Sequence, residues 1–75
     1  AIRLDLKYDR AHNQRGNAYY GKGQYQQAIA DYTEAIRLNA QEPVYYENRA
    51  SAYKQLGQKG MATPDENKAR QLRGK

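Results

Sequence analysis

The sequence predicts an all-α protein built from antiparallel pairs of helices that stack side by side. Three observations support this prediction: an internal repeat with a period of about 34 residues, apolar side chains spaced three and four apart, and Gly and Pro residues between the expected helices. With 75 residues the chain has the length of one small domain, and a domain of this size has a thin hydrophobic core. Its apolar residues are largely Ala and Tyr, with no Phe or Trp, which suits close contact between helices.

The repeat relates the two halves of the chain in a single register. The segment Ala1-Ile2-Arg3-Leu4 recurs further along the chain as Ala35-Ile36-Arg37-Leu38. No insertion interrupts this register, so internal repetition is the organising feature of the chain. Further residues share the same offset: Arg15 with Arg49, Ala18 with Ala52, Tyr19 with Tyr53, Gly23 with Gly57, Gln24 with Gln58, Ala28 with Ala62, Asp31 with Asp65, Ala35 with Ala69 and Leu38 with Leu72.

We expect the first complete helix over residues 10–20, with Asp9 as its N-terminal cap. The glycines of Gly21-Lys22-Gly23 should end this helix, because glycine favours the conformation that follows a helix C-terminus. One face of the helix is marked by residues at spacings of three and four: Ala11, Arg15, Ala18 and Tyr19.

The second helix is expected over residues 25–38 and the third over residues 44–55. Pro43 suits the first position of the third helix, where a missing N–H costs nothing, and Gly57 should follow its end. The second helix carries an apolar stripe at helical spacing: Ala28, Ile29, Tyr32, Ala35 and Ile36. The third helix is expected to bury Tyr46, Ala50 and Tyr53.

The last segment departs from the pattern. A faithful repeat would place Pro64 inside the final helix, at a cost of about 3 kcal/mol. The residues Thr63-Pro64-Asp65-Glu66 form a capping box with Pro at the first helical position. We therefore predict a shortened last helix from Pro64 to about Arg73, preceded by an irregular link. A kinked helix from about Lys59 is the alternative.

A period of about 34 residues with these motifs resembles the tetratricopeptide repeat (TPR) family. The resemblance implies helix pairs stacked as a short right-handed superhelix in one domain, residues 1–75. It divides the chain into the end of a preceding repeat (1–8), repeat one (9–42) and a degenerate repeat two (43–75). The matching residues are Gly16, Tyr19, Ala28, Tyr32 and Ala35, then Tyr46, Ala50, Tyr53, Ala62 and Ala69. The departures are His12, Arg15, Ala40 and Glu66.

Catalytic chemistry is not indicated. The chain has no Cys and a single His, so we expect no metal site, no cofactor and no enzyme activity, with His12 as a packing residue. Asp31 and Glu34 are expected on a solvated helix face. Arg15 and Arg49 suggest either a basic ladder or, preferably, side chains whose stems pack while their charged ends reach water. No membrane-spanning segment is expected, and the compartment is left open, with the cytoplasm favoured.

The resemblance implies protein–protein interaction through a concave groove lined by the first helix of each pair. A peptide would there meet amide donors, a Tyr ring and positive charge. The leading contacts are expected to be Tyr20, Lys54 and two Asn residues. The complete groove set comprises Arg10, Asn13, Asn17, Tyr20 and Gly21 from the first copy, and Val44, Glu47, Asn48, Ser51, Lys54 and Gln55 from the second.

Some family members clamp the C-terminal carboxylate of heat-shock chaperones with two Asn residues. Asn17 and Asn48 stand at those positions here, but the clamp Lys is replaced by Asn13. An acidic C-terminal segment is thus one possible partner, and a plain surface role for both Asn residues is the alternative. Two other functions stay open: a structural, self-associating array fragment, and salt-sensitive binding of nucleic acid or an anionic surface, which the net charge of +5 permits. Nucleic acid is the less expected partner, because the basic residues are spread along the chain.

Overall fold

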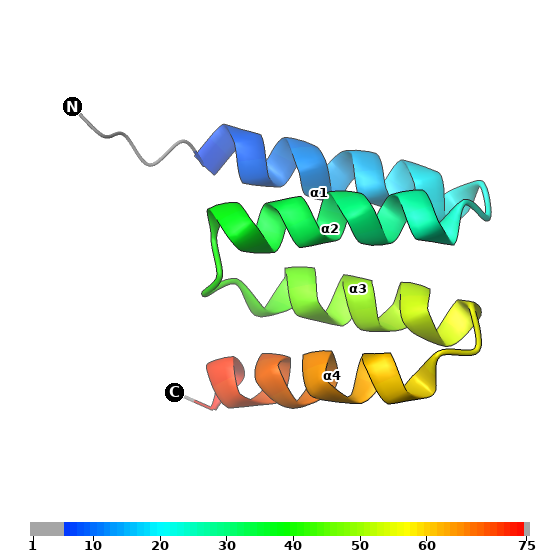
Figure 1. Ribbon diagram of the computed structural model, residues 1–75. Helices are drawn as coiled ribbons and strands as arrows, with labels where there is room; N and C mark the ends of the chain where they lie inside the picture. The colour runs from blue at the N-terminus through cyan, green and yellow to red at the C-terminus, as the bar shows by residue number, and fades with distance from the viewer. Residues whose placement is uncertain (1–5, 75) are drawn as a thin grey trace.

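The computed structural model describes residues 6–74 as four α-helices joined by short turns (Figure 1). The helices are α1 (Leu6–Gly21), α2 (Tyr25–Leu38), α3 (Pro43–Gln55) and α4 (Lys59–Arg73). No strand occurs between residues 6 and 74, so the all-α prediction is confirmed. The segment Ala1-Ile2-Arg3-Leu4, assigned to the end of a preceding repeat, lies outside the described residues.

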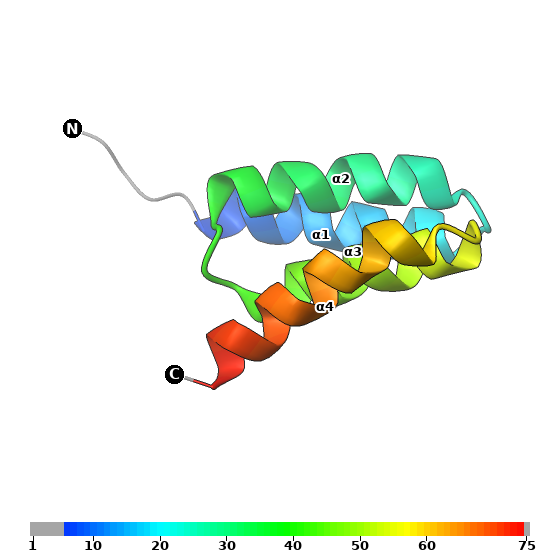
Figure 2. The same cartoon turned by 60° about the horizontal axis from the view of Figure 1, so that its bottom comes forward.

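The four helices lie side by side in chain order, each antiparallel to the one before it (Figure 1). The layer is thin, with Cα extents of 42 × 29 × 13 Å. After a 60° turn of the view, the α3–α4 hairpin slants against the α1–α2 hairpin (Figure 2). The expected architecture of stacked helix hairpins is therefore present, with a twist from one hairpin to the next.

Both hairpin turns are built in the same way. Gly23 and Gly57 adopt φ values of 79° and 78°, a left-handed conformation that side chains other than hydrogen rarely permit. In each turn the residue after this glycine donates its N–H to a carbonyl of the preceding helix: Gln24 to Tyr19 at 2.9 Å and Gln58 to Tyr53 at 2.8 Å. The repeated Gly therefore closes each hairpin as expected.

Small alanines and one tyrosine form the centre of the core. Ala28 and Tyr32 of α2 and Ala52 of α3 make one buried cluster, each at most 1% exposed. Close packing of this kind is possible because the alanine methyl groups let neighbouring helices approach. The equivalent positions of the two repeats are buried alike: Ala28, Ala35, Ala62 and Ala69. On α3, Tyr46 and Ala50 are buried as predicted, and Tyr53 is half-buried.

The face of α1 that the spacing marks is largely exposed in the structure. Ala11, Arg15 and Ala18 are exposed. Their counterparts on α3 include Tyr45 and Ala52, which are 5% and 0% exposed. The difference arises because α3 lies between α2 and α4, whereas α1 is an edge helix of the described layer (Figure 1).

Asp9 is not a helix cap, because α1 begins at Leu6 and Asp9 lies inside it, only 2% exposed. Its Oδ2 accepts a hydrogen bond from the Tyr45 hydroxyl at 2.6 Å and one from Asn39 Nδ2 at 3.4 Å. Burial and this carboxylate raise the pKa of Tyr45 above its usual value, so the hydroxyl keeps its proton. Asp9 thus joins α1 to α3 and to the turn between the hairpins.

The start of α4 also differs from the prediction. The helix begins at Lys59, with Pro64 inside it, and the Thr63 hydroxyl donates back to the Lys59 carbonyl at 3.1 Å instead of capping a helix. Helical geometry from Lys59 brings Ala62 into the core, at 0% exposure. Pro64 and Gly60 are both exposed, so water can satisfy the Gly60 carbonyl that loses its N–H partner. Tertiary packing therefore outweighs the local preference.

Candidate functional site

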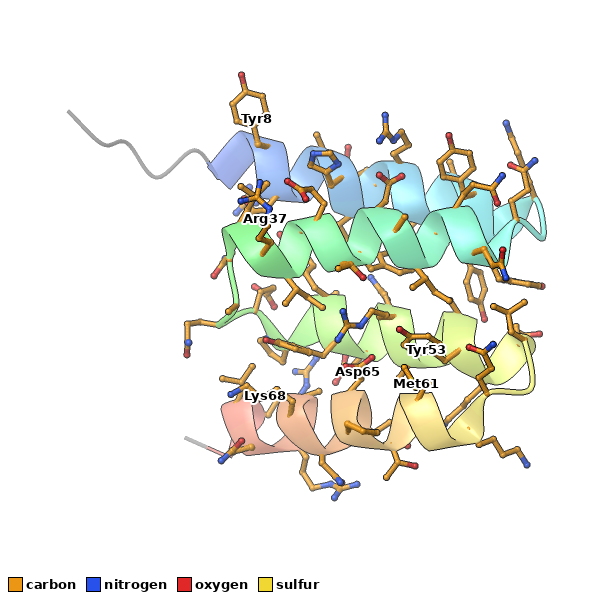
Figure 3. The ribbon with its side chains drawn as sticks, in the orientation of Figure 1. Tyr8, Arg37, Tyr53, Met61, Asp65 and Lys68 are labelled. Atoms are coloured by element: carbon orange, nitrogen blue, oxygen red, sulfur yellow. The ribbon has the colours of Figure 1, made fainter. Side chains whose placement is uncertain are left out.

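Each hairpin is closed by an Arg–Asp pair with two parallel hydrogen bonds. Arg15 contacts Asp31 through Nε–Oδ2 at 2.9 Å and Nη2–Oδ1 at 2.8 Å. Arg49 contacts Asp65 through the same atoms at 2.8 and 2.7 Å. Both carboxylates are 4% exposed, so the prediction that Asp31 lies on a solvated face is wrong. Figure 3 shows Asp65 between α4 and α3.

These pairs change the interpretation of the repeated arginines. The hydrogen bond from Arg15 lowers the pKa of Asp31, against the opposing effect of burial, so that carboxylate stays charged. The hydrogen bond to Asp65 likewise raises the pKa of Arg49. Because each guanidinium is held by a carboxylate of its own hairpin, the two arginines are neither a ladder for external anions nor simply extended into water.

His12 belongs to the first of these clusters. Its Nδ1 lies 3.4 Å from Oδ1 of Asp31, and its side chain is 30% exposed. Between residues 6 and 74 no group of three His, Asp or Glu side chains could hold a metal ion. Within the same residues no helix is both long enough and apolar enough to span a bilayer.

A hollow of about 340 Å³ lies where α1 and α3 approach each other over α2. We call it the α1–α3 hollow. Five of the predicted groove residues line it together: Asn17, Tyr20 and Gly21 from α1, and Asn48 and Ser51 from α3. Tyr32 of α2 completes the lining. The helices thus bring side chains from two different hairpins, distant in sequence, into one site.

The two asparagines of the hollow are oriented by hydrogen bonds. The Tyr32 hydroxyl donates to Asn17 Oδ1 at 2.6 Å, and Asn48 Nδ2 donates to Asn13 Oδ1 at 2.8 Å. Burial raises the pKa of Tyr32 to about 12, so its hydroxyl remains a donor at neutral pH. The Nδ2 group of Asn17 can then donate to a ligand. Asn48 keeps one N–H and its carbonyl oxygen for a ligand as well.

One wall of the hollow is aromatic. The ring of Tyr20 meets that of Tyr25 edge to face, with centroids 5.1 Å apart and an interplanar angle of 74°. This geometry is favourable for aromatic pairs and restrains the Tyr20 ring. From the sequence, Tyr32 was assigned to the apolar stripe of the second helix and was not among the predicted groove residues.

The remaining predicted groove residues lie outside the hollow. Arg10 and Val44 are exposed on α1 and α3, and Val44 is 38% exposed. Glu47 and Lys54 are directed to α4 instead. Glu47 accepts two hydrogen bonds from Arg73 at 2.6 and 2.8 Å, and Lys54 pairs with Glu66. A second hollow of about 420 Å³ lies there, lined by Glu47, Glu66, Ala69, Arg70 and Arg73.

Stacked helix hairpins with a hollow between their first helices define a helical-repeat fold. Residues 9–41 match the model of the tetratricopeptide repeat family. The fold superposes with a TM-score of 0.89 on the first TPR of Spaghetti (RPAP3) bound to HSP90 peptide SRMEEVD, at 35% identity. That match covers 96% of this chain and 57% of the other. Residues 9–41 therefore form a tetratricopeptide repeat, and over 96% of its length the chain has the fold of a TPR domain.

Several longer proteins contain a similar segment. The mitochondrial import receptor subunit TOM70 of Rattus norvegicus is 42% identical over 66 residues, which cover 81% of this chain and 11% of that protein. The translocon at the outer membrane of chloroplasts 64 of Pisum sativum is 50% identical over 44 residues, or 59% and 7%. Hsp70-Hsp90 organizing protein 2 of Arabidopsis thaliana is 41% identical over 44 residues, or 59% and 8%. The chain therefore spans a small part of these relatives.

Proposed function

We propose that the chain binds an extended peptide segment of a partner protein along α1 and α3. The observation that carries this proposal is the α1–α3 hollow, where amide and hydroxyl groups of both hairpins converge on one space. A peptide backbone in an extended conformation offers N–H and C=O groups that such side chains can bind. The hollow needs both hairpins, so residues 9–42 and 43–75 act as one binding unit.

An acidic C-terminal segment is the first ligand to test. The RPAP3 module, 35% identical to this chain, holds the HSP90 peptide SRMEEVD. Asn17 and Asn48, the two positions that resemble a carboxylate clamp, both line the α1–α3 hollow. Both side chains have an N–H available to a ligand acceptor. Arg10 and Val44, which are exposed on the same two helices, would contribute at the margins of the groove.

Binding without catalysis is part of the proposal. The one histidine is packed against a carboxylate that a guanidinium already holds. The polar groups of the hollow are amides and hydroxyls, which donate and accept hydrogen bonds and are not acids or bases near neutral pH. Such groups recognise a ligand and do not transform it.

The test is fluorescence anisotropy with a labelled SRMEEVD peptide. Asn17→Ala and Asn48→Ala should each weaken binding by about 1–3 kcal/mol if these amides donate to a charged acceptor. Asn67→Ala is the matched control, because Asn67 is an exposed amide on α4 that does not line the hollow. Equal losses for all three variants, or none for any, would contradict binding in the hollow.

Self-association is a second candidate, favoured by the outer face of α1. Ala11 and Ala18 are exposed there, whereas the equivalent α3 face is buried. Tyr8 is 62% exposed and points away from the other helices (Figure 3). Sedimentation over a concentration series tests this role: a mass that rises with concentration and returns to the monomer in Ala11→Glu would support it. A monomer at high concentration would exclude it.

A further inference from the structure

We infer that the α1–α3 hollow takes an uncharged stretch of peptide main chain and does not require a free terminal carboxylate. This inference rests on the proposed function and specifies which part of a bound peptide enters the hollow. The lining contains no charged side chain, whereas a site for a carboxylate usually includes a cation. Three properties of the lining support it: the mixture of donors and acceptors, the absence of charge, and the size.

The lining offers donors and acceptors in comparable number. Asn17 presents Nδ2 as a donor, since its oxygen is occupied by the Tyr32 hydroxyl. Asn48 presents both a spare N–H and its carbonyl oxygen, and the hydroxyl of Ser51 can act in either sense. A peptide unit has one donor and one acceptor and satisfies such a set. An ionised carboxylate accepts only, so the Asn48 oxygen would oppose it.

No charged side chain lines the hollow among the described residues. The cations of α3 are engaged elsewhere: Arg49 with Asp65 and Lys54 with Glu66. Lys22 follows the lining residue Gly21 but is exposed in the turn. A carboxylate that leaves water for a site without a cation loses hydration that neutral donors replace only in part. The electrostatics therefore favour a neutral ligand group.

The size of the hollow points the same way. At about 340 Å³ it lies near the lower end of the range for ligand pockets, about 300–1,000 Å³. It has room for a short stretch of main chain, while the rest of a peptide would continue along α1 and α3. A main-chain stretch of this kind can come from the interior of a partner sequence as well as from its end.

The experiment compares three labelled peptides by anisotropy: SRMEEVD with a free C-terminus, the same peptide with a C-terminal amide, and the peptide extended by two glycines. Each is titrated with the native chain, with Asn17→Ala and with Lys22→Gln. We expect the three dissociation constants to agree within about twofold, because no charge-assisted bond to a terminus is lost. Asn17→Ala should weaken all three alike, by about 2- to 12-fold, the effect of one neutral hydrogen bond.

Lys22→Gln should likewise leave the three dissociation constants within about twofold of one another, because Lys22 does not line the hollow. A loss of about tenfold or more on amidation or extension would overturn this inference and leave the proposed function intact, because it would show a charge-assisted contact to the terminus. Failure of all three peptides to bind, or binding that Asn17→Ala does not weaken, would overturn the proposed function together with the inference. A failure of this inference alone is therefore distinguished from a failure of the proposed function by one result: whether any peptide binds with an affinity that Asn17→Ala lowers.

Discussion

Gly16 of α1 is in direct contact with the ring of Tyr32 on α2. A methyl group at Gly16 would lie 2.7 and 2.9 Å from two ring carbons, Cε1 and Cδ1, and 3.2 Å from the carbonyl oxygen of Ala28. The second repeat has Ala50 and Glu66 at the equivalent positions. The second repeat thus has a methyl group, in Ala50, where it lacks the tyrosine ring. The first repeat has glycine at residue 16 because Tyr32 leaves no room for a methyl group.

Gly16→Ala should destabilise the fold. Alanine in place of glycine stabilises a helix by about 1 kcal/mol, but the new methyl group would overlap a ring that is 1% exposed and held by Asn17. Overpacking of this kind costs about 1–3 kcal/mol. We expect a net loss of up to about 2 kcal/mol in the free energy of unfolding, measured by urea denaturation.

The matched control is Gly60→Ala. Gly60 is an exposed helical residue of α4 with no atom within 4 Å of an added methyl group. There the helix preference of alanine acts alone and should stabilise by about 0.5–1 kcal/mol. Stabilisation by both substitutions would mean that the contact between residue 16 and the ring does not restrict the packing of α1 on α2.

The Arg49–Asp65 pair should be more important for stability than the Arg15–Asp31 pair. The side chain of Arg49 is 20% exposed and that of Arg15 is 62% exposed, although both carboxylates are buried. Arg49→Ala leaves the buried Asp65 side chain without its partner, at a cost of about 3–5 kcal/mol. Arg15→Ala should cost less, because water can reach Asp31 from the exposed side of the pair.

Thermal unfolding of four proteins checks this prediction: the native chain, Arg49→Ala, Arg15→Ala and the double variant Arg49→Ala with Asp65→Ala. The double variant should recover part of the loss, since no charge is then left without a partner. If Arg49→Ala unfolds at the same temperature as Arg15→Ala, burial of the guanidinium does not determine the strength of these pairs.

Much of the fold could be predicted from the chain because local and repeated features agreed. The predicted bounds of α2, Tyr25 to Leu38, match the structure. The apolar stripe of this helix lies between a glycine-containing turn before it and a polar turn after it. Gly23 and Gly57 recur at one offset and close the two hairpins. The tetratricopeptide resemblance was also confirmed by the matching family model.

The burial of carboxylates was not predictable from local pattern. An Asp on a helix usually faces water, and the partners that bury Asp9 and Asp31 lie on other helices. One indication was overlooked: Arg and Asp stand 16 residues apart in both repeats, as Arg15 with Asp31 and as Arg49 with Asp65. A pair of opposite charges repeated at that separation indicates a contact across the hairpin.

The orientation of the groove residues depended on partners at a distance in sequence. Glu47 and Lys54 stand at helix positions that face the groove in the family, yet they turn to Arg73 and Glu66 of α4. Glu66 is one of the departures from the family pattern, and its carboxylate pairs with Lys54. A departure in the second helix of a pair thus altered the surface of the first.

Stability should fall in acid, in part through Asp31. Arg15 holds the folded-state pKa of this carboxyl below its usual value of 3.8. A depressed folded-state pKa stabilises the fold above the unfolded-state value of about 3.9, and this stabilisation is lost as the pH falls through the folded-state pKa. The free energy of unfolding, measured between pH 5 and pH 2, should therefore decrease less steeply for Asp31→Asn than for the native chain.

The substitution Glu66→Gln is the control for the acid experiment, because Glu66 belongs to an exposed pair with Lys54. Exposed pairs contribute little to stability, about 0–1 kcal/mol, so its pH dependence should stay close to that of the native chain. Parallel curves for Asp31→Asn and the native chain would contradict a depressed pKa at Asp31.

The two prolines should respond oppositely to replacement by alanine. Pro64 lies inside α4, where it leaves the Gly60 carbonyl without its N–H donor, so Pro64→Ala should raise the free energy of unfolding by about 1–3 kcal/mol. Pro43 begins α3, where its ring fits the first helical turn, so Pro43→Ala should be neutral or destabilise by about 0.4–1 kcal/mol. Urea denaturation of both variants measures the contrast. If Pro64→Ala is not more stable than the native chain, Pro64 carries no cost in α4. The burial of Ala62 is then not needed to offset such a cost.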